Sequence, residues 1–287
     1  MDGADIDQEQ PWLLHSFSVG ALNFCAFDIC PQSAEHANDH DELLLAAPNG
    51  LDSGGIDVFH LPSERRIMQS SSDKNIKTGM VMALSIFHDP LTKLLTLASG
   101  YEDGHVMLHT LNNTETTWQR RSTSKPHSQP VLSLDVSHTK EYLITSSADA
   151  VVAKFVVKDI ISATNTSVPT KTANTKHSGQ QDLRIRSDGK IFATAGWDAR
   201  IRVYSAKTMK ELAVLKWHKD GCYAVAFADT DATIRNRVMM GAEAELSPLL
   251  AKSALDVIKQ ERATKAQTTH WLAAGGKDGK ISLWDIY

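Results

Sequence analysis

A short pattern recurs five times along this chain and constrains its fold more than any other feature. The pattern is a strand of alternating apolar residues, a tight polar turn, and a second such strand that ends on a ring. It is most complete at residues 192–204, FATAGWDARIRVY, which align without gaps to residues 47–59, 97–109, 143–155 and 272–284. In four copies an Asp stands six residues before the ring, and Ser53 takes that place in the first copy.

The spacing of these turns predicts the architecture. The turn residue recurs at positions 53, 103, 149, 198 and 278, so the first four copies lie 46 to 50 residues apart and the last interval is 80. Periods in the forties with several strands each are typical of β-propeller blades. We therefore predict an all-β propeller with five recognisable blades, forming a single domain over residues 1–287. The long last interval predicts an insertion at residues 229–269 of the last blade.

The insertion contains one predicted amphipathic helix. Ser247 is suited to cap its start, and Pro248 is suited to its first helical position. An apolar stripe then recurs at helical spacing, and it consists of Leu250, Ala254, Val257 and Ile258. This stripe either packs on the rim of the propeller or binds a partner helix or groove.

The last copy carries the dipeptide Trp284-Asp285, and the repeat as a whole resembles the WD-repeat family. That resemblance implies buried sets that fasten each blade: a turn Asp, a hydroxyl four residues earlier, a His from the preceding loop and a ring. By position these sets are His127, Thr145, Asp149 and Phe155; then His177, Thr194, Asp198 and Tyr204; then His218, Asp278 and Trp284. Two residues depart from this pattern. The Phe155 side chain has no N–H to donate, and Ala274 occupies the hydroxyl position of the last copy.

The number of blades leaves two interpretations open. The resembled family usually has seven blades, which implies an N-terminally shortened ring. A closed five-bladed ring would instead use residues 11–18, PWLLHSFS, as an outer strand beside the strand of Trp284, because this pairing covers an exposed sheet edge. Residues 161–178 are low in complexity and predict a loop.

No segment of the sequence carries a recognisable catalytic motif. His218 and Cys222 lie close together, but the repeat places one in the loop before a strand and the other at its start, which favours structural roles. Residues 32–42 contain two His and several acidic residues, yet the apolar scaffold that would fix metal ligands is missing, which favours a solvated loop. We predict a protein with no enzymatic activity, no cofactor and no metal site.

Composition narrows the class of partner. The net charge of -4 and the pI near 6.3 argue against a nucleic-acid surface, which is usually basic. Three Cys residues are too few for a disulfide framework and suit a reducing compartment. No signal segment or long apolar run is present in the sequence. We expect a soluble intracellular protein that binds proteins rather than nucleic acid, membranes or a small-molecule substrate.

Residues 187–287 resemble, more narrowly, the fungal family of ASTRA-associated protein 1. This resemblance implies a nuclear, non-enzymatic scaffold subunit of an ASTRA-like complex, linked to chromatin remodelling and to maturation of phosphatidylinositol-3-kinase-related kinases. The cytoplasm remains a second compartment. A G-protein β-like signalling propeller and a substrate receptor of a ubiquitin ligase remain alternative functions.

The turns also predict where a partner binds. In the resembled family the residue before each turn Asp faces solvent around the central channel, and these residues are Asp52, Glu102, Ala148, Trp197 and Lys277. Trp is strongly enriched among binding hot spots. We predict a partner contact at Trp197, flanked by the positive groups of Arg200 and Lys277. Glu102 should limit which charged groups of the partner can approach. The alternative is that Trp197 packs on a neighbouring blade, because Trp is well buried on average.

Overall fold

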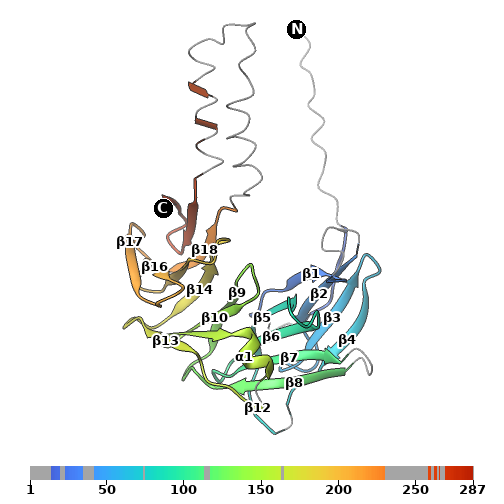
Figure 1. Cartoon of the computed structure of the whole chain (residues 1–287). Helices are drawn as coiled ribbons and strands as arrows, with labels where there is room; N and C mark the ends of the chain where they lie inside the picture. Colours follow the sequence, from blue (N-terminus) through green and yellow to red (C-terminus); the bar gives the residue numbers. More distant parts are fainter. Residues whose placement is uncertain are drawn as a thin grey trace, which may run out of the picture.

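Five sheets stand side by side in an arc (Figure 1). The computed structural model describes residues 14–19, 23–34, 42–73, 75–112, 117–162, 165–229, 258–259, 262–263, 265 and 269–286. The first sheet contains β1 (Asp28–Pro31), β2 (Leu43–Pro48), β3 (Ile56–Leu61) and β4 (Arg65–Ser70). The second contains β5 (Val81–His88), β6 (Leu95–Tyr101), β7 (Val106–Asn112) and β8 (Thr117–Ser124).

The remaining three sheets repeat this order. The third contains β9 (Val131–Val136), β10 (Tyr142–Ser147), β11 (Val151–Val156) and β13 (Lys171–Asn174). The fourth contains β14 (Gln180–Ile185), β15 (Ile191–Gly196), β16 (Arg200–Ser205) and β17 (Glu211–Lys216). The fifth contains β18 (Cys222–Phe227), β19 (Trp271–Gly276) and β20 (Ile281–Asp285). Each sheet is one blade, so the prediction of an all-β propeller fold is confirmed.

The hydrophobic core lies between blades rather than inside each one. Four clusters of buried side chains join the first blade to the second, the second to the third, the third to the fourth, and the fourth to the fifth. The second strand of each of the first four blades is therefore covered on both faces, and all six residues of β10 and of β15 are buried. Small or apolar residues throughout these strands, as in IFATAG, fit that double burial.

The segment that was predicted to complete the last blade lies elsewhere. Residues 14–18 form no strand, and the Phe17 ring contacts the Phe59 ring of β3 with centroids 4.8 Å apart. His15 Nδ1 lies 2.8 Å from Glu64 Oε1 in the turn before β4. The predicted pairing beside the strand of Trp284 is thus wrong for these residues, because their contacts with Phe59 and Glu64 hold them at the first blade. Residues 11–13 lie outside the described residues.

The region after the third repeat also differs from its prediction. Residues 161–178 are not one loop, because α1 (Val157–Ser162) extends into them and two strands follow. Strand β13 is the fourth strand of the third blade, whereas β12 (Asn165–Thr166) pairs in parallel with β8 of the second blade. These residues form strands because they pair with strands that are distant in the sequence, and composition alone does not reveal such pairing.

The predicted insertion lies between β18 and β19, and most of it falls outside the described residues, including Leu250, Ala254 and Val257. Residues 258–259, 262–263 and 265 are helical, and the Ile258 side chain is 45% exposed. Across the part of the chain that the structure describes, every helix is too short or too polar to span a membrane.

Candidate functional site

The third blade holds a buried hydrogen-bonded set at its turn. His127, in the loop before β9, lies with Nε2 2.9 Å from Thr145 Oγ1 and Nδ1 3.3 Å from Asp149 Oδ1. Asp149 also accepts hydrogen bonds from the backbone N–H groups of Ser128 and Val151. Burial raises the pKa of Asp149, but these hydrogen bonds outweigh it and hold the pKa below its usual value. Phe155 is buried and packs in the cluster between the second and third blades.

The last blade builds an equivalent set with its hydroxyl on a different strand. His218 Nδ1 lies 3.1 Å from Asp278 Oδ1, and His218 Nε2 lies 2.9 Å from Ser282 Oγ. Trp284 Nε1 donates to the same Ser282 Oγ at 2.9 Å. Ser282 on β20 pairs directly across from Ala274 on β19. The cross-strand neighbour therefore supplies the hydroxyl that Ala274 lacks.

The fourth blade departs from the predicted set. Thr194 Oγ1 donates to Gln180 Oε1 at 2.7 Å, so Gln180 takes the place assigned to His177. The His177 side chain is half exposed, and its Nδ1 lies 3.4 Å from Asp198 Oδ2. Tyr204 stacks on Phe192 with ring centroids 5.0 Å apart instead of joining the hydrogen-bonded set. The carry-over of His177 and Tyr204 into one set with Thr194 is wrong.

Asp198 has a different principal partner in this blade. Arg202 donates from Nη1 to Asp198 Oδ1 at 3.0 Å and from Nη2 to Asp198 Oδ2 at 2.6 Å. The Arg202 side chain is 3% exposed, and it stands directly across from Thr194 on the neighbouring strand. Burial raises the pKa of Asp198, but the hydrogen bonds and the charge of Arg202 lower it by more. The net result is a pKa below the usual value. An ion pair between the buried Arg202 and the more exposed Asp198 therefore fixes this turn.

These sets are suited to fastening blades rather than to catalysis. The His127 and His218 side chains have 0% exposure, so no substrate reaches them. Burial raises the pKa of Cys222 to about 11, which keeps the thiol protonated and weakly nucleophilic. Within the described ranges, no group of three His, Cys, Asp or Glu side chains is placed to hold a metal ion.

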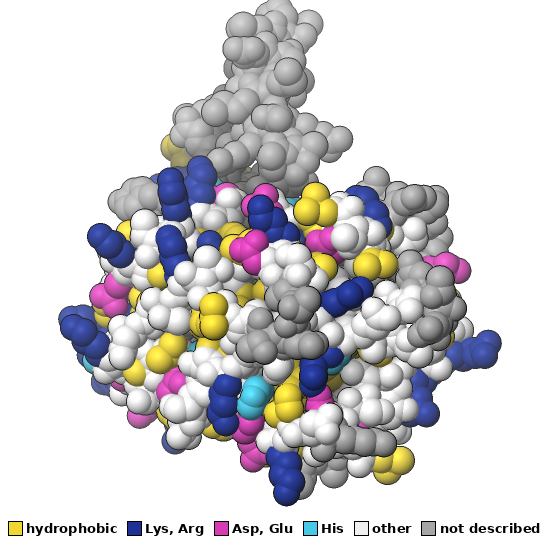
Figure 2. Space-filling model, turned by 60° about the horizontal axis from the view of Figure 1, so that its bottom comes forward, with side chains coloured by type: hydrophobic (Ala, Val, Ile, Leu, Met, Phe, Trp, Pro, Cys, Tyr) yellow, Lys and Arg dark blue, Asp and Glu magenta, His cyan; other side chains and the backbone are white. Residues whose placement is uncertain are grey.

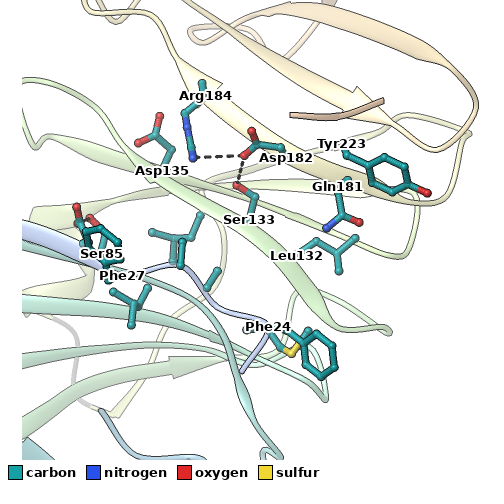
Figure 3. Close-up of a pocket in the computed structure, with 16 residues that line it drawn as sticks. Phe24, Phe27, Ser85, Leu132, Ser133, Asp135, Gln181, Asp182, Arg184 and Tyr223 are labelled. Carbon is teal, nitrogen blue, oxygen red and sulfur yellow. Dashed lines mark hydrogen bonds and ion pairs between the residues drawn. The ribbon is translucent and has the colours of Figure 1, made fainter. Parts of the chain in front are cut away.

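A cavity of 470 Å³ opens along the inner strands, where residues of all five blades meet (Figure 3). Phe24, Phe27 and Tyr223 line it as exposed aromatic side chains. Its carboxylates are engaged in fastening neighbouring blades, because Asp182 Oδ2 accepts from Val225 N at 2.9 Å and Asp135 Oδ2 accepts from Ile185 N at 2.7 Å. Burial raises the pKa of Asp135 to about 6.

Trp197 is held in a half-exposed position on its turn. Its ring is 45% exposed, and Nε1 donates to Gln181 Oε1 at 2.8 Å. The other side of the ring lies on Gly179, where a Cβ would come within 2.1 Å of ring carbons and where φ is +77°. Only a glycine permits both this approach and this backbone conformation. The ring is therefore presented in a fixed orientation.

The residues predicted around Trp197 are only partly brought together. Gly221 links two turns, because its carbonyl accepts from Lys277 N at 2.8 Å and its Cα side lies against the Trp197 backbone. Arg200 follows on the same turn and is partly buried, whereas Lys277 is exposed. Glu102 belongs to the second blade, where it accepts from Met80 N at 3.1 Å. The turns of Lys277 and Trp197 are thus linked through Gly221, whereas Glu102 lies on the turn of the second blade and is not part of this link.

Besides Phe24 and Phe27, the sequence interpretation missed the exposed aromatic residues Trp217 and Tyr223. Trp217 is 51% exposed, and Lys280 Nζ lies 5.6 Å from its ring centroid. Tyr223 is 44% exposed and stands two residues after Gly221 in the sequence. The available signal was position, since Trp217 stands immediately before the loop residue His218. On the face shown in Figure 2, Lys and Arg side chains are interspersed with Asp and Glu.

Comparison with known proteins agrees with this geometry. The family described as "WD domain, G-beta repeat" matches residues 118–153, 169–205 and 265–285. Together with the blade order, this match defines a WD40-repeat β-propeller protein.

Curated relatives narrow the family. ASTRA-associated protein 1 of Penicillium rubens is 48% identical over 97% of this chain and 72% of the relative. ASTRA-associated protein 1 of Verticillium alfalfae is 49% identical over 100% of this chain and 70% of the relative. The chain belongs to the ASTRA-associated protein 1 family. The mouse guanine nucleotide-binding protein subunit beta-like protein 1 is 28% identical over 99% of this chain.

Proposed function

We propose that this protein is a non-enzymatic scaffold subunit of a multi-subunit ASTRA-like complex, acting in the nucleus in chromatin remodelling and in maturation of phosphatidylinositol-3-kinase-related kinases. The observation that carries the proposal is the 45 to 49% identity to four fungal proteins named ASTRA-associated protein 1. A WD40 scaffold with buried, structurally engaged His and Asp side chains supports a role in binding rather than catalysis. The partners are proteins, and no nucleic acid, membrane or small-molecule substrate takes part.

The partner contact is proposed at Trp197. A half-exposed Trp with its ring fixed by Gly179 and Gln181 loses little conformational entropy on binding, which favours a hot spot. Lys277 adds positive charge on the neighbouring turn, which Gly221 links to that of Trp197, and Arg200 adds it two residues after Asp198. This arrangement suits a partner segment with an apolar or aromatic anchor and an acidic neighbour, whereas Glu102 disfavours acidic groups over the second blade.

Substitution of Trp197 tests the proposal. Trp197→Ala should weaken partner binding by at least about 2 kcal/mol and lower the unfolding free energy by about 1–2 kcal/mol, because one hydrogen bond and the packing on Gly179 are lost. Affinity purification with mass spectrometry from the native organism measures the first, and denaturant unfolding measures the second. Leu212→Ala is the matched control, because Leu212 is 59% exposed on the outer strand β17.

Four results would contradict parts of this proposal. Recovery of every partner at parental levels would exclude Trp197 as the contact. A stability loss of about 3–5 kcal/mol would instead identify Trp197 as core. Purification without ASTRA-type subunits, or exclusively cytoplasmic fluorescence of a tagged chain, would reject the complex and the compartment. The mouse relative's name makes a signalling propeller the second candidate, and co-purification of G-protein subunits would favour it.

A further inference from the structure

A second cavity, of 590 Å³, opens on the face opposite the turn of Asp149. The Asp149 turn joins β10 to β11, whereas this cavity includes the turn that joins β9 to β10, so the two lie at opposite ends of β10. The β5–β6 turn and the start of α1 form its other walls. The cavity is thus built entirely by the second and third blades, and its volume is that of a typical binding site.

The charged groups that line this cavity are mainly positive. Two carboxylates are present, and one of them is already engaged, because Asp89 is 3% exposed and its Oδ2 accepts hydrogen bonds from Thr92 N and Thr92 Oγ1, both at 2.7 Å. The other carboxylate belongs to the exposed Glu141. Three lysines line the same cavity, and none forms an ion pair with another described residue: Lys140, Lys154 and Lys158.

Lys154 is the most constrained of these lysines. Its Nζ lies 3.7 Å from the centroid of the Tyr142 ring and donates to Ala206 O at 2.8 Å. Lys154 also stands directly across from Lys171 on β13, and like charges in this arrangement repel each other. Burial and the charge of Lys171 lower the pKa of Lys154, although Glu141 acts in the opposite direction.

The ammonium of Lys154 therefore lacks a counter-ion. An ammonium group has three N–H donors, and the hydrogen bond to Ala206 uses one of them. The remaining donors belong to a partly buried cation, for which an anion in the cavity would supply both an acceptor and the missing charge. Lys140 and Lys158 add positive charge from the β9–β10 turn and from α1.

The wall formed by the β5–β6 turn is apolar. Pro90 and Leu91 line the cavity there, and Leu91 is 74% exposed. A fitting ligand consequently combines a negative charge with an adjacent apolar group. A protein segment with an aliphatic residue beside an acidic or phosphorylated residue has both features, whereas a free inorganic anion has only the first.

We propose that this cavity binds a negatively charged side chain of a partner protein, a carboxylate or a phosphate, with Lys140, Lys154 and Lys158 as its counter-ions and Leu91 against a neighbouring aliphatic residue. Hydrogen bonds between ionised groups are stronger than neutral ones, and a phosphate with a charge of about −1.5 to −2 gains most. The site uses none of the residues around Trp197. It can therefore be correct whether or not the contact at Trp197 is.

Three peptides test the site on the full chain and distinguish the two anions. Each is fluorescein-labelled Gly-Leu-X-Leu-Gly, where X is phosphoserine, glutamate or glutamine. Fluorescence anisotropy should show saturable binding of the phosphoserine peptide, at least tenfold tighter than that of the glutamine peptide. A glutamate peptide within about threefold of the phosphoserine peptide would assign a carboxylate ligand, and a much weaker one would assign a phosphorylated partner. Equal affinities of all three peptides would overturn the proposal.

Variants of the lysines locate the binding. Lys154→Met keeps an aliphatic stem over the Tyr142 ring but removes the charge, so it should weaken phosphoserine-peptide binding at least tenfold. Lys140→Asn combined with Lys158→Gln should weaken it at least fivefold, and asparagine suits the positive φ of residue 140. Lys219→Gln is the matched control, because it removes the same charge from an exposed loop at the other end of the blades. Circular dichroism and the melting temperature show whether each variant folds.

Several outcomes would exclude this site. Absence of saturable binding of both anionic peptides to the parent chain would reject it. Parental affinity in the folded double variant would also reject it, even if Lys154→Met does not fold. An equal loss of affinity in Lys219→Gln would show attraction by overall charge rather than a site. A single-stranded oligothymidylate that binds more tightly than either anionic peptide, and that loses affinity in the same variants, would assign the cavity to nucleic acid instead of a protein.

Discussion

The position of one hydroxyl in the last blade gives a sharp test of how the blades are fastened. Ser282 Oγ lies 2.9 Å from both His218 Nε2 and Trp284 Nε1, and the His218 side chain is fully buried. Ser282→Ala leaves a buried ring nitrogen of His218 and the N–H of Trp284 without their partner. Because an unsatisfied buried polar group costs about 1–3 kcal/mol, and Trp284 is reached by water, we expect a loss of about 2–3 kcal/mol.

A compensating substitution tests the reasoning more strictly than the loss alone. Ala274 stands directly across from Ser282, at the strand position where Thr145 serves His127 in the third blade. Ala274→Ser combined with Ser282→Ala moves the hydroxyl across the strand pair without changing composition. The double variant restores a hydroxyl for His218 and should recover at least half of the lost unfolding free energy. The hydrogen bond of Trp284 stays lost.

Guanidinium unfolding at constant pH measures both effects. For a domain of this size, 2–3 kcal/mol corresponds to a decrease in melting temperature of roughly 3–5 °C. Ala274→Ser alone is the control for added bulk. An unchanged stability in Ser282→Ala would show that the hydroxyl does not fasten the blade. A double variant as unstable as the single one would show that position, rather than the hydroxyl itself, is what matters.

Three further results are expected. Asp198→Ala should cost about 3 kcal/mol, because it leaves the buried guanidinium of Arg202 without its main counter-charge, and Arg202→Met in the same background should recover part of this in denaturant unfolding. The pKa of Asp149 is lower in the folded chain than in the unfolded chain. Its contribution to stability is therefore present above the unfolded pKa, near 4, and is lost as the pH falls through the folded value. Asp149→Asn should flatten this acid dependence when unfolding is measured as a function of pH. Burial raises the pKa of the three cysteines to about 11 or 12, so Ellman's reagent at pH 8 should label them only as fast as the chain opens, and rapid labelling of the native protein would contradict their burial.

The fold was predictable because its signal is local and repeated. An Asp six residues before a ring, at intervals in the forties, identifies the turn and both flanking strands of a blade. The first copy shows the limit of gapless alignment. Ala47 pairs with Asp57 where Ser99 pairs with Met107, so the turn of the first blade is longer, and Asn49 lies within it rather than at the strand position. Hydrogen bonds from Asn49 to Asp57 stabilise this longer turn.

The fastening sets were less predictable because hydrogen-bonding groups substitute for one another in space. Ser282 replaces the hydroxyl missing at Ala274 from the strand opposite, and Gln180 replaces His177 three residues further along the chain. Neither substitution preserves the sequence spacing that identifies the set. The contact of Phe17 with Phe59 was unpredictable for a related reason, since a short apolar segment fits any uncovered apolar face.

The arrangement of the core between blades has a consequence for how the protein comes apart. Each buried cluster joins only two neighbouring blades, so the described molecule behaves as a one-dimensional row of units coupled to their nearest neighbours. The blades in the middle of the row have two coupled neighbours, whereas the first and fifth have one. Opening should therefore begin at the ends and spread inward, and amide hydrogen exchange should be slowest in β10 and fastest in β1 and β20. Any partner that binds an end blade adds a neighbour to the row and stabilises blades that it does not touch.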